Sequence, residues 1–407
     1  MTKIVILCQV FVSEYMIYRW QKMVQDFSDV EITLIGPTEY ICADWGGPIN
    51  LALSAIEQER FRFIPLRFVC NRVLNRVFQS GVKVPGLENI LKAIKPDLIY
   101  LIGTEISDVT FQVALARKFF LPKSKLALFT MRGLDMPLHN PVFRIRWRLL
   151  RSVVDAFFCH YPHCVEVLRT QGRVTQPIYM QTQVGVNTDI FKPDIEKRQR
   201  IREKLGVKDD EYLFGSLSRM DLRKGLLDMV DALPVKAKWK FAMMGSGTDQ
   251  KAVEEAVRAK GLTGKVLFPG MIDLPYGVAE YINALDCSVL MSKTSSSYID
   301  TFALAVAQSM AIGLPVIVSD SGGLPYQVGK EGIVVHEGDV DGLHKAMEYV
   351  SSNPEEGRTI GAKMMRRLLV SFSVPHLNHC FYVSAQDIIN GLTNKKHFDQ
   401  QDFTFVE

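Results

Sequence analysis

The sequence has no apolar run that approaches the roughly 18 residues of a membrane-spanning helix. Its seven cysteines are odd in number, and no two have the C-x-x-C spacing of a redox motif or a zinc site. We therefore expect buried thiols in a cytoplasmic protein, with neither a disulfide framework nor a zinc finger. No internal repeat or low-complexity tract is visible.

The N-terminus resembles a signal peptide, but it lacks a strongly positive start and a cleavage site. Residues 3–12 are mostly apolar, yet they carry one positive charge and are not followed by a small-x-small cleavage site. We expect a buried first strand there. Hydrophobic residues make up 47% of the chain and charged residues 23%, which is ordinary for a globular protein. The length predicts two to three domains of roughly 150 residues each.

Positive charge gathers in the first half. Residues 1–195 hold 23 Lys and Arg against 17 Asp and Glu, whereas residues 196–407 hold 25 against 27. Residues 59–95 alone contain eight basic and two acidic residues, with Phe, Leu and Val between them. Two interpretations stay open: this segment contacts anionic lipid at the inner face of the cell membrane, or it is a basic exposed helix without a partner. We expect no nucleic-acid partner.

Short apolar segments alternate with helical ones in both halves, which predicts an α/β fold with two Rossmann-like, doubly wound parallel sheets facing a central cleft. The expected strands are 4–7, 32–35, 98–101, 126–129, 156–159 and 178–180, then 212–215, 240–244, 266–268, 287–291, 315–318 and 332–335. The expected domains are 1–195 and 196–370, followed by a helix over 371–392 that returns to the first domain and a polar tail over 393–407.

The segment from Asp300 to Pro325 predicts an anion-binding helix end. A polar loop precedes a helix over 302–311, a buried strand over 315–318 and a turn at Gly322 and Gly323. A helix that begins after such a loop presents unpaired backbone N–H groups and the positive end of its dipole, which favours a phosphate.

This segment resembles the donor-binding signature of the retaining GT-B glycosyltransferases of group 1, also called family 4. That signature is Glu, seven residues, Glu, then Ala-Met-Ala-x-Gly-x-Pro-Val. The matching positions are Phe302, Leu304, Met310, Ala311, Gly313, Pro315 and Val316. The two acidic positions differ, because Asp300 and Gln308 stand there. The resemblance implies a GT-B fold in which the second domain binds a nucleotide-sugar and the first domain binds the acceptor.

The resemblance extends to two more donor-site segments. Arg219 and Lys224, followed by Gly225, match the cations that neutralise a departing nucleoside diphosphate. The turn Gly245-Ser246-Gly247 matches the glycine turn near the nucleoside, and the backbone at Met271 and Ile272 matches the region that contacts the base. Taken alone, without the resemblance, the two cations are better explained as a solvated basic loop, and the turn as a simple strand end.

The altered acidic positions have two interpretations each. Asp300 either contacts the donor sugar, as the resemblance implies, or caps the following helix. Gln308 either bonds the ribose hydroxyls, without the charge assistance of a glutamate, or is a core amide. The backbone N–H groups over Thr301, Phe302, Ala303 and Leu304 are expected to contact sugar and phosphate oxygens. The polar loop 292–298 either shapes the sugar pocket or is an ordinary exposed loop.

The first half matches the family less closely. The usual glycine-rich loop after the first strand is absent, and Arg132 stands where a histidine is expected. Glu105 and Arg132 are candidate acceptor-side residues, although an arginine cannot act as a base at neutral pH. The segment 184–193 matches the family's interdomain segment. Asp339 and Asp341 form a D-x-D pattern, but they precede a helix and fit as capping residues, so we expect no metal and no cofactor.

Three functions follow. The first is a retaining glycosyltransferase in polysaccharide biosynthesis that moves a sugar from a nucleotide-sugar to a glycan or lipid-linked acceptor, with a UDP-sugar favoured and a GDP-sugar as the second choice. The second is a non-catalytic member that binds nucleotide-sugars or acts as a scaffold. The third is a sugar-nucleotide epimerase, which the eight histidines do not support.

Overall fold

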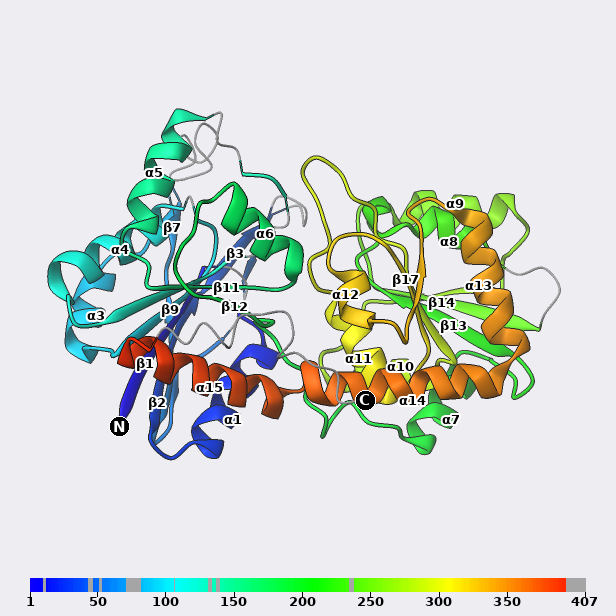
Figure 1. Ribbon diagram of the computed structural model, residues 1–407. Helices are drawn as coiled ribbons and strands as arrows, with labels where there is room; N and C mark the ends of the chain where they lie inside the picture. Colours follow the sequence, from blue (N-terminus) through cyan, green and yellow to red (C-terminus); the bar gives the residue numbers. More distant parts are fainter. Residues whose placement is uncertain are drawn as a thin grey trace. The chain divides into compact units, whose positions relative to one another are not determined.

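The computed structural model describes residues 1–9, 12–42, 47–50, 53–70, 82–105, 107–130, 134–136, 140–233 and 238–392. The chain forms two compact units (Figure 1), of which the first comprises residues 1–185 with the C-terminal helix α15 (Val374–Asn390), and the second comprises Val186–Ser373. Each unit is built on a parallel sheet with helices between its strands. The predicted class, α/β with two Rossmann-like parallel sheets, is confirmed.

The first sheet has eight strands, of which all neighbours are parallel except the last two. Its spatial order is β12 (Ile178–Met180), β11 (Ala156–Cys159), β10 (Lys125–Phe129), β9 (Leu98–Ile102), β1 (Thr2–Cys8), β2 (Val30–Pro37), β6 (Phe61–Leu66) and β5 (Ile56–Glu57). The helices of this unit are α1 (Glu14–Asp26), α3 (Leu87–Ile94), α4 (Asp108–Phe120), α5 (Pro141–Arg151), α6 (Pro162–Thr170) and α15. Two short antiparallel pairs join β3 (Glu39–Cys42) to β4 (Gly47–Asn50) and β7 (Val69–Cys70) to β8 (Val82–Lys83).

Strand β6 lies inside the basic segment 59–95 and corrects part of its interpretation. Phe61 and Phe63 are buried in the core, and Arg62 between them bonds Glu31 at 3.0 Å. The alternation of Arg and Phe is therefore the period of two of a strand, not the face of a helix. These two aromatic rings cannot face lipid. Residues 71–81 lie outside the described residues, so the membrane contact predicted for the whole segment stays a prediction.

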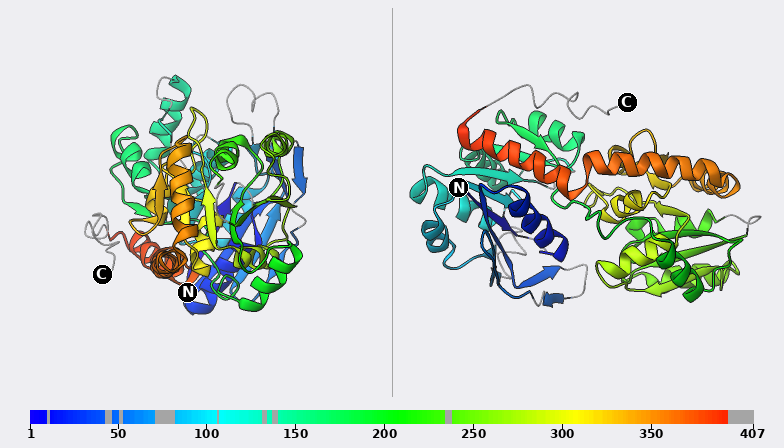
Figure 2. Two further views of the ribbon diagram at one scale, coloured as in Figure 1. Left: turned by 90° about the vertical axis from the view of Figure 1, so that its right-hand side faces the viewer. Right: turned by 90° about the horizontal axis from the view of Figure 1, so that it is seen from below.

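Helix α15 packs on the first sheet beside α1 (Figures 1 and 2). Phe381 of α15 makes edge and tilted ring contacts with Trp20, Tyr100 and Phe158 at centroid distances of 5.0, 4.9 and 6.0 Å. Arg19 of α1 is fully buried; its guanidinium donates to the Asn378 side chain at 3.3 Å. Burial lowers the pKa of Arg19 to about 10, which leaves it charged at neutral pH.

The second sheet has six strands, all parallel, in the order β15 (Val266–Gly270), β14 (Trp239–Met244), β13 (Tyr212–Leu217), β16 (Cys287–Leu290), β17 (Val316–Ser319) and β18 (Ile333–Val335). Each corresponds to a predicted strand. The helices are α7 (Ile195–Lys204), the short 3₁₀ turn η2 (Leu222–Lys224), α8 (Leu226–Asp231), α9 (Gln250–Ala259), α10 (Tyr276–Ala284), α11 (Leu304–Ile312), α12 (Leu324–Val328), α13 (Val340–Ser352) and α14 (Pro354–Ser371). Asp339 caps α13 by accepting from the Gly342 backbone N–H at 2.8 Å, as predicted.

Candidate functional site

The strand order of the second sheet reverses between β13 and β16. The chain runs outward from β13 through β14 to β15, then returns to the other side of β13 with β16 and continues to β18. In open parallel sheets a ligand binds at such a reversal, outside the carboxyl ends of the strands. The loop after β13 carries Arg219 and Lys224, and the loop after β16 leads to Asp300. The two predicted charged segments therefore meet where this fold places a ligand.

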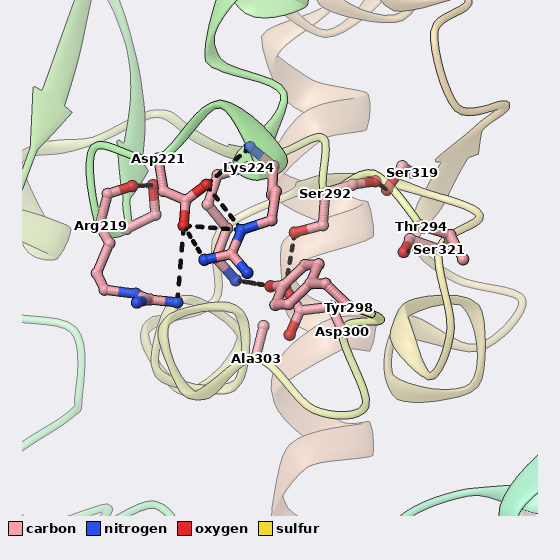
Figure 3. A network of polar contacts seen from close by, with 12 residues as sticks. Arg219, Asp221, Lys224, Ser292, Thr294, Tyr298, Asp300, Ala303, Ser319 and Ser321 are labelled. Carbon is pink, nitrogen blue, oxygen red and sulfur yellow. Dashed lines mark hydrogen bonds and ion pairs between the residues drawn. The ribbon is translucent and has the colours of Figure 1, made fainter. Parts of the chain in front are cut away.

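Three side chains converge on the carboxylate of Asp300 (Figure 3). The Lys224 ammonium lies 2.6 Å from Asp300 Oδ2, and the Ser292 hydroxyl donates to the same oxygen at 2.6 Å. The Tyr298 hydroxyl lies between the two charges: it accepts from Lys224 Nζ and donates to Asp300 Oδ2 at 3.2 Å. The Lys224 and Asp300 side chains are only 14% and 10% exposed, so this is a mostly buried ion pair.

The pair shifts both of its pKa values toward the charged forms. Burial alone would raise the pKa of Asp300, but the Lys224 charge and three hydrogen bonds outweigh it, so that pKa lies below its ordinary value. Burial likewise opposes the charge on Lys224, yet Asp300 and Tyr298 hold its pKa above the ordinary value. For Tyr298, burial raises the pKa, which keeps its hydroxyl protonated. The cluster is thus a fixed ammonium, a fixed carboxylate and a neutral phenol.

Arg219 and Arg223 lie on either side of Asp221, which caps η2. Arg223 pairs directly with Asp221 and covers the Tyr298 ring at 4.7 Å, whereas Arg219 Nη2 lies 3.9 Å from Asp221 Oδ2. The ring contact and the ion pair leave the Arg223 side chain 34% exposed. Asp221 therefore pairs closely with Arg223 and lies farther from Arg219.

Two glycines let these loops approach each other closely. Gly225 has φ +68°, and a Cβ there would lie 1.9 Å from the Met291 carbonyl oxygen, next to Ser292. Gly245 has φ +128°, and a Cβ there would lie 2.0 Å from the carbonyl oxygen of Ser218, beside Arg219. Only glycine fits either position. Both glycines of the predicted motifs are therefore needed to bring the loops after β13, β14 and β16 together.

Helix α11 begins at Leu304 rather than at the predicted Phe302. Ala303 is extended, and its backbone is held by the buried Gln327 side chain, which accepts from Ala303 N–H at 3.0 Å and donates to Ala303 O at 2.8 Å. Arg367 in turn donates to the Gln327 carbonyl at 2.8 Å. The Ala303 N–H is thus already bonded in this arrangement, and the first-turn N–H groups from Leu304 onward are those that a helix leaves unpaired.

Gln308 lies on the second turn of α11 and is 3% exposed. Thr301 and Phe302 are half-buried just before the helix, and the Phe302 ring packs against Phe372 at 5.4 Å. Their roles as donor contacts stay predictions.

The loop 292–298 is tied at several points. Lys293 bonds Asp228 at 2.8 Å, Ser295 bonds the Tyr298 backbone, and Thr294 N–H donates to Glu337 at 2.7 Å. It is therefore an ordered loop, and it places Tyr298 against Asp300.

The glycine turn after β14 and the segment after β15 lie at the same sheet edge. The Met220 N–H donates to the Ser246 carbonyl at 3.0 Å, and the Gly245 N–H donates to the Gly270 carbonyl at 2.8 Å. Gly247 and Met271 are exposed, and Ile272 is half-buried.

Residues 197–366 match the model of the family described as glycosyl transferases group 1.

The matched residues lie within the second unit and make up less than half of the chain. The chain is 30% identical over 185 residues to a GDP-mannose-dependent α-(1-6)-phosphatidylinositol monomannoside mannosyltransferase of Mycolicibacterium smegmatis, a match that covers 44% of this chain and 48% of that protein. It matches the putative glycosyltransferase EpsD of Bacillus subtilis at 27% over 202 residues, 48% of this chain and 50% of that one. The match thus spans about half the length of each curated relative.

Solved structures support the GT-B fold over nearly the whole chain. Sucrose-phosphate synthase from Thermosynechococcus elongatus superposes with a TM-score of 0.72 at 19% identity, covering 96% of this chain and 100% of that one. HepE from Anabaena, in complex with UDP, superposes with a TM-score of 0.72 at 17% identity, covering 95% of this chain and 100% of that one. At these identities the likeness shows the fold alone.

The first unit has a reversal of its own, between β1 and β9. Gln9 follows β1 and bonds Thr110 and Ser107, at 2.8 and 2.6 Å, in the region after β9. Glu105, in the same loop, is 3% exposed and accepts from the Thr130 hydroxyl. Gln9 thus joins two loops where the family usually has a glycine-rich turn. Arg132 lies outside the described residues, so its predicted role stays a prediction.

The described residues bear on metal binding and on membrane spanning. Within them, no group of three or more His, Cys, Asp or Glu is arranged to hold a metal ion. No helix in that part of the chain is long and apolar enough to cross a membrane.

Four residues of the candidate site were not singled out by the sequence analysis: Gln327 and Asp221, and also Ser292 and Tyr298, which it included only as the ends of the polar loop 292–298. Tyr298 lies two residues before Asp300, a spacing that shows nothing by itself without the loop's conformation. Gln327 follows the Gly322-Gly323 turn, and no local pattern marks it as a partner of Ala303.

Proposed function

We propose that this protein is a retaining glycosyltransferase that moves a sugar from a nucleoside-diphosphate sugar to a glycan or lipid-linked acceptor. One observation carries the proposal: the buried Lys224–Asp300 pair lies at the strand-order reversal of the second sheet, in the loops that also carry Arg219 and lead into α11. A cation that is held by a carboxylate and a phenol is prepared to meet a diphosphate without reorganising.

The chemistry follows from what these groups can do. An ammonium has three N–H donors, and Lys224 uses two for Tyr298 and Asp300, so the third can donate to a phosphate oxygen. The bond between the sugar C1 and the diphosphate breaks, a new bond forms from C1 to the acceptor oxygen on the same face, and the acceptor proton passes to the departing phosphate. Arg219 and Lys224 stabilise the charge on the leaving diphosphate. This route needs no protein nucleophile and no metal.

For the donor, we favour a UDP-sugar. Structures of Anabaena HepE are described in complex with UDP and with UDP-glucose, and they share this fold. A GDP-sugar remains the second choice, because curated relatives from Mycolicibacterium smegmatis and Corynebacterium glutamicum are named GDP-mannose-dependent. We assign the ribose contact to Gln308 and the base contact to the backbone at Met271 and Ile272.

We place the acceptor in polysaccharide biosynthesis and the protein in the cytoplasm. Relatives support this setting, among them an O-antigen biosynthesis glycosyltransferase of Escherichia coli that is 27% identical over 124 residues. Glu105 is the proposed acceptor-side residue of the first unit, since it lies at that unit's strand-order reversal.

The test begins with calorimetric titration of the purified protein with UDP, GDP and ADP. We expect micromolar binding of one of them and release of that nucleoside diphosphate when the matching sugar donor and an acceptor are supplied. Gln308→Glu is expected to tighten nucleotide binding about fivefold, because an ionised acceptor makes stronger bonds to the ribose hydroxyls. An unchanged dissociation constant would remove Gln308 from the ribose site.

Turnover then tests the cations. Arg219→Ala is expected to lower kcat by roughly a hundredfold, the effect of removing one donor from a developing charge. The matched control is Arg258→Ala, since Arg258 is exposed on α9. Equal turnover in both variants contradicts the assignment.

One observation favours a second function, nucleotide-sugar binding without transfer. The Lys224 charge is already compensated by Asp300, and Gln308 is neutral where the family has an acid. Binding of a nucleoside diphosphate with no release from any donor tested would support this function over the first.

A further inference from the structure

Two neighbouring helices of the first unit carry six large apolar side chains that face solvent. On α5 these are Val142, Ile145 and Leu149, which are 44%, 62% and 56% exposed. On α4 they are Leu115, Phe119 and Phe120, which are 52%, 66% and 52% exposed. We call these six residues the docking surface. Single exposed apolar residues are ordinary, but six on adjacent helices need an explanation.

Helix α5 has one apolar stripe more than its packing requires. Phe143, Trp147 and Leu150 are buried and attach the helix to the first unit. Val142, Ile145 and Leu149 recur at intervals of three and four residues, which places them on a second stripe along the exposed side. The buried stripe accounts for the folding of the helix, so the exposed stripe has another use.

Contacts of Arg146 connect α5 with α4, which carries the other exposed apolar residues. Arg146 of α5 pairs with Asp108 at the start of α4, and its guanidinium lies 4.7 Å from the centre of the Phe111 ring. From there Leu115 and Phe119 continue along the same side of α4, at intervals of four residues. At the end of α4, Lys92 of α3 covers the Phe120 ring at 3.6 Å. Figure 1 shows α3, α4 and α5 along one side of the first unit.

The exposed charged residues of α4 and α5 are all basic. Arg144 and Arg148 are exposed on α5 next to the apolar stripe, and Lys118 is exposed on α4. Helix α5 contains no acidic residue, and the single acid of α4, Asp108, is already paired with Arg146. Aliphatic and aromatic side chains flanked by arginine and lysine suit an interface between acyl chains and anionic headgroups.

We propose that this face of α4 and α5 binds the surface of an anionic lipid membrane. Apolar side chains would enter the boundary of the acyl chains, while Arg144, Arg148 and Lys118 would remain at the level of the phosphates. A second copy of this chain fits less well, because pairing the same face would bring the arginines of both copies together. The inference does not depend on the transfer reaction, and it concerns a different surface from the predicted segment 59–95.

The test is co-sedimentation of the full chain with two kinds of vesicle. One kind is pure phosphatidylcholine, and in the other about 30% of the lipid is phosphatidylglycerol. We expect binding to the anionic vesicles only. Ile145→Ser with Leu149→Ser should lower the partition coefficient by about tenfold or more, because two apolar side chains no longer leave water. Arg144→Ala with Arg148→Ala should lower it by about 25-fold, since each arginine near the surface contributes about fivefold.

Matched controls come from the second unit. Leu369→Ser with Val370→Ser removes two exposed apolar residues of α14, and Lys251→Ala with Arg258→Ala removes two exposed cations of α9. Both control variants should bind as the natural chain does. All substituted side chains are exposed, so the thermal midpoints should agree. The proposal is overturned if the natural chain ignores anionic vesicles, if the α5 variants bind normally, or if Ile145→Ser with Leu149→Ser changes only the oligomeric state, which would identify a second copy as the partner.

Discussion

The ammonium of Lys224 and the carboxylate of Asp300 lie 2.6 Å apart, although 76 residues separate them in the chain. Both side chains are about nine-tenths buried. Burial of either charge alone would be costly, so each is retained by the presence of the other and by the hydroxyls of Tyr298 and Ser292. The loops that supply a proposed donor site are therefore connected before any donor arrives.

Removing one member of this pair should destabilise the second unit more than removing both. Lys224→Met leaves a buried carboxylate unpaired, at a cost of about 3 kcal/mol, and Asp300→Asn leaves a buried ammonium. Lys224→Met combined with Asp300→Asn should recover at least about 1 kcal/mol of that loss. Urea unfolding of the four proteins measures the coupling.

A control for this cycle is the exposed pair Lys238–Asp210, whose side chains are 74% and 55% exposed. Lys238→Met should leave the unfolding midpoint nearly unchanged, because solvent screens such a pair. Strictly additive losses at Lys224 and Asp300 would mean that the two side chains do not interact in solution.

Stability should fall at acid pH partly because of Asp300. Its pKa is lowered in the folded state. The contribution of its charge to the free energy of unfolding is therefore complete at pH values above the ordinary pKa near 4, and it disappears as pH falls through the folded pKa. The pKa of Lys224 is raised, so its contribution is complete below its ordinary value and disappears only at strongly alkaline pH. Thermal midpoints of the natural chain and of Asp300→Asn, compared from pH 7 to pH 3, should converge at the acid end. A constant difference across that range would contradict the lowered pKa.

Tyr298→Phe should weaken the proposed reaction without unfolding the protein. The change removes one hydroxyl that bonds both an ammonium and a carboxylate, an interaction of about 2 kcal/mol with charged groups. If Tyr298 positions Lys224 for the leaving diphosphate, kcat should fall about tenfold while KM for the donor changes little. The matched control is Tyr349→Phe, because Tyr349 is 46% exposed on α13. A rise in KM alone would indicate a binding role, and equal kinetics would remove Tyr298 from the site.

Gly225→Ala should be far more harmful than Gly264→Ala. Both glycines have positive φ, at +68° and +82°, so both substitutions impose backbone strain of about 1 kcal/mol. Only at Gly225 would the new Cβ meet another atom, the Met291 carbonyl oxygen at 1.9 Å, whereas nothing lies within 4 Å of a Cβ at Gly264. The difference in unfolding free energy should exceed about 2 kcal/mol. Equal losses would show that the β13 and β16 loops move apart readily.

Much of the fold was predictable because buried parallel strands have a strong local pattern. Runs such as those in β1, β9 and β17 are almost wholly apolar, as strands covered on both faces must be. Strand β6 was missed because its Arg62 and Pro65 interrupt the run, and the surrounding basic residues suggested a helix face. Its place beside β2 depends on pairing with residues far away in the chain.

The candidate site likewise has residues that local motifs predict and contacts that they do not. Arg219, Lys224, Gly225 and Gly245 belong to local motifs, so their approximate position followed from the family resemblance. Asp221 and the Tyr298 ring cover Arg223 in part, and no local motif indicates these contacts. Helix α11 begins at Leu304 and not at the predicted Phe302. The reason is that Gln327, 24 residues after Ala303, holds the Ala303 backbone. Such contacts form only after the strands have brought the loops together.

By itself, the sequence determined the alternation of strands and helices, the glycines at positive φ and the cations of the loop after β13, because these depend on residues that are neighbours in the chain. Only the tertiary structure decided which carboxylate meets Lys224, which hydroxyls join them, and which apolar stripe of α5 is buried and which faces solvent. The physical reason is that a side chain's charge, burial and hydrogen bonds depend on what packs against it, and its partners here come from strands that are adjacent in space but distant in sequence.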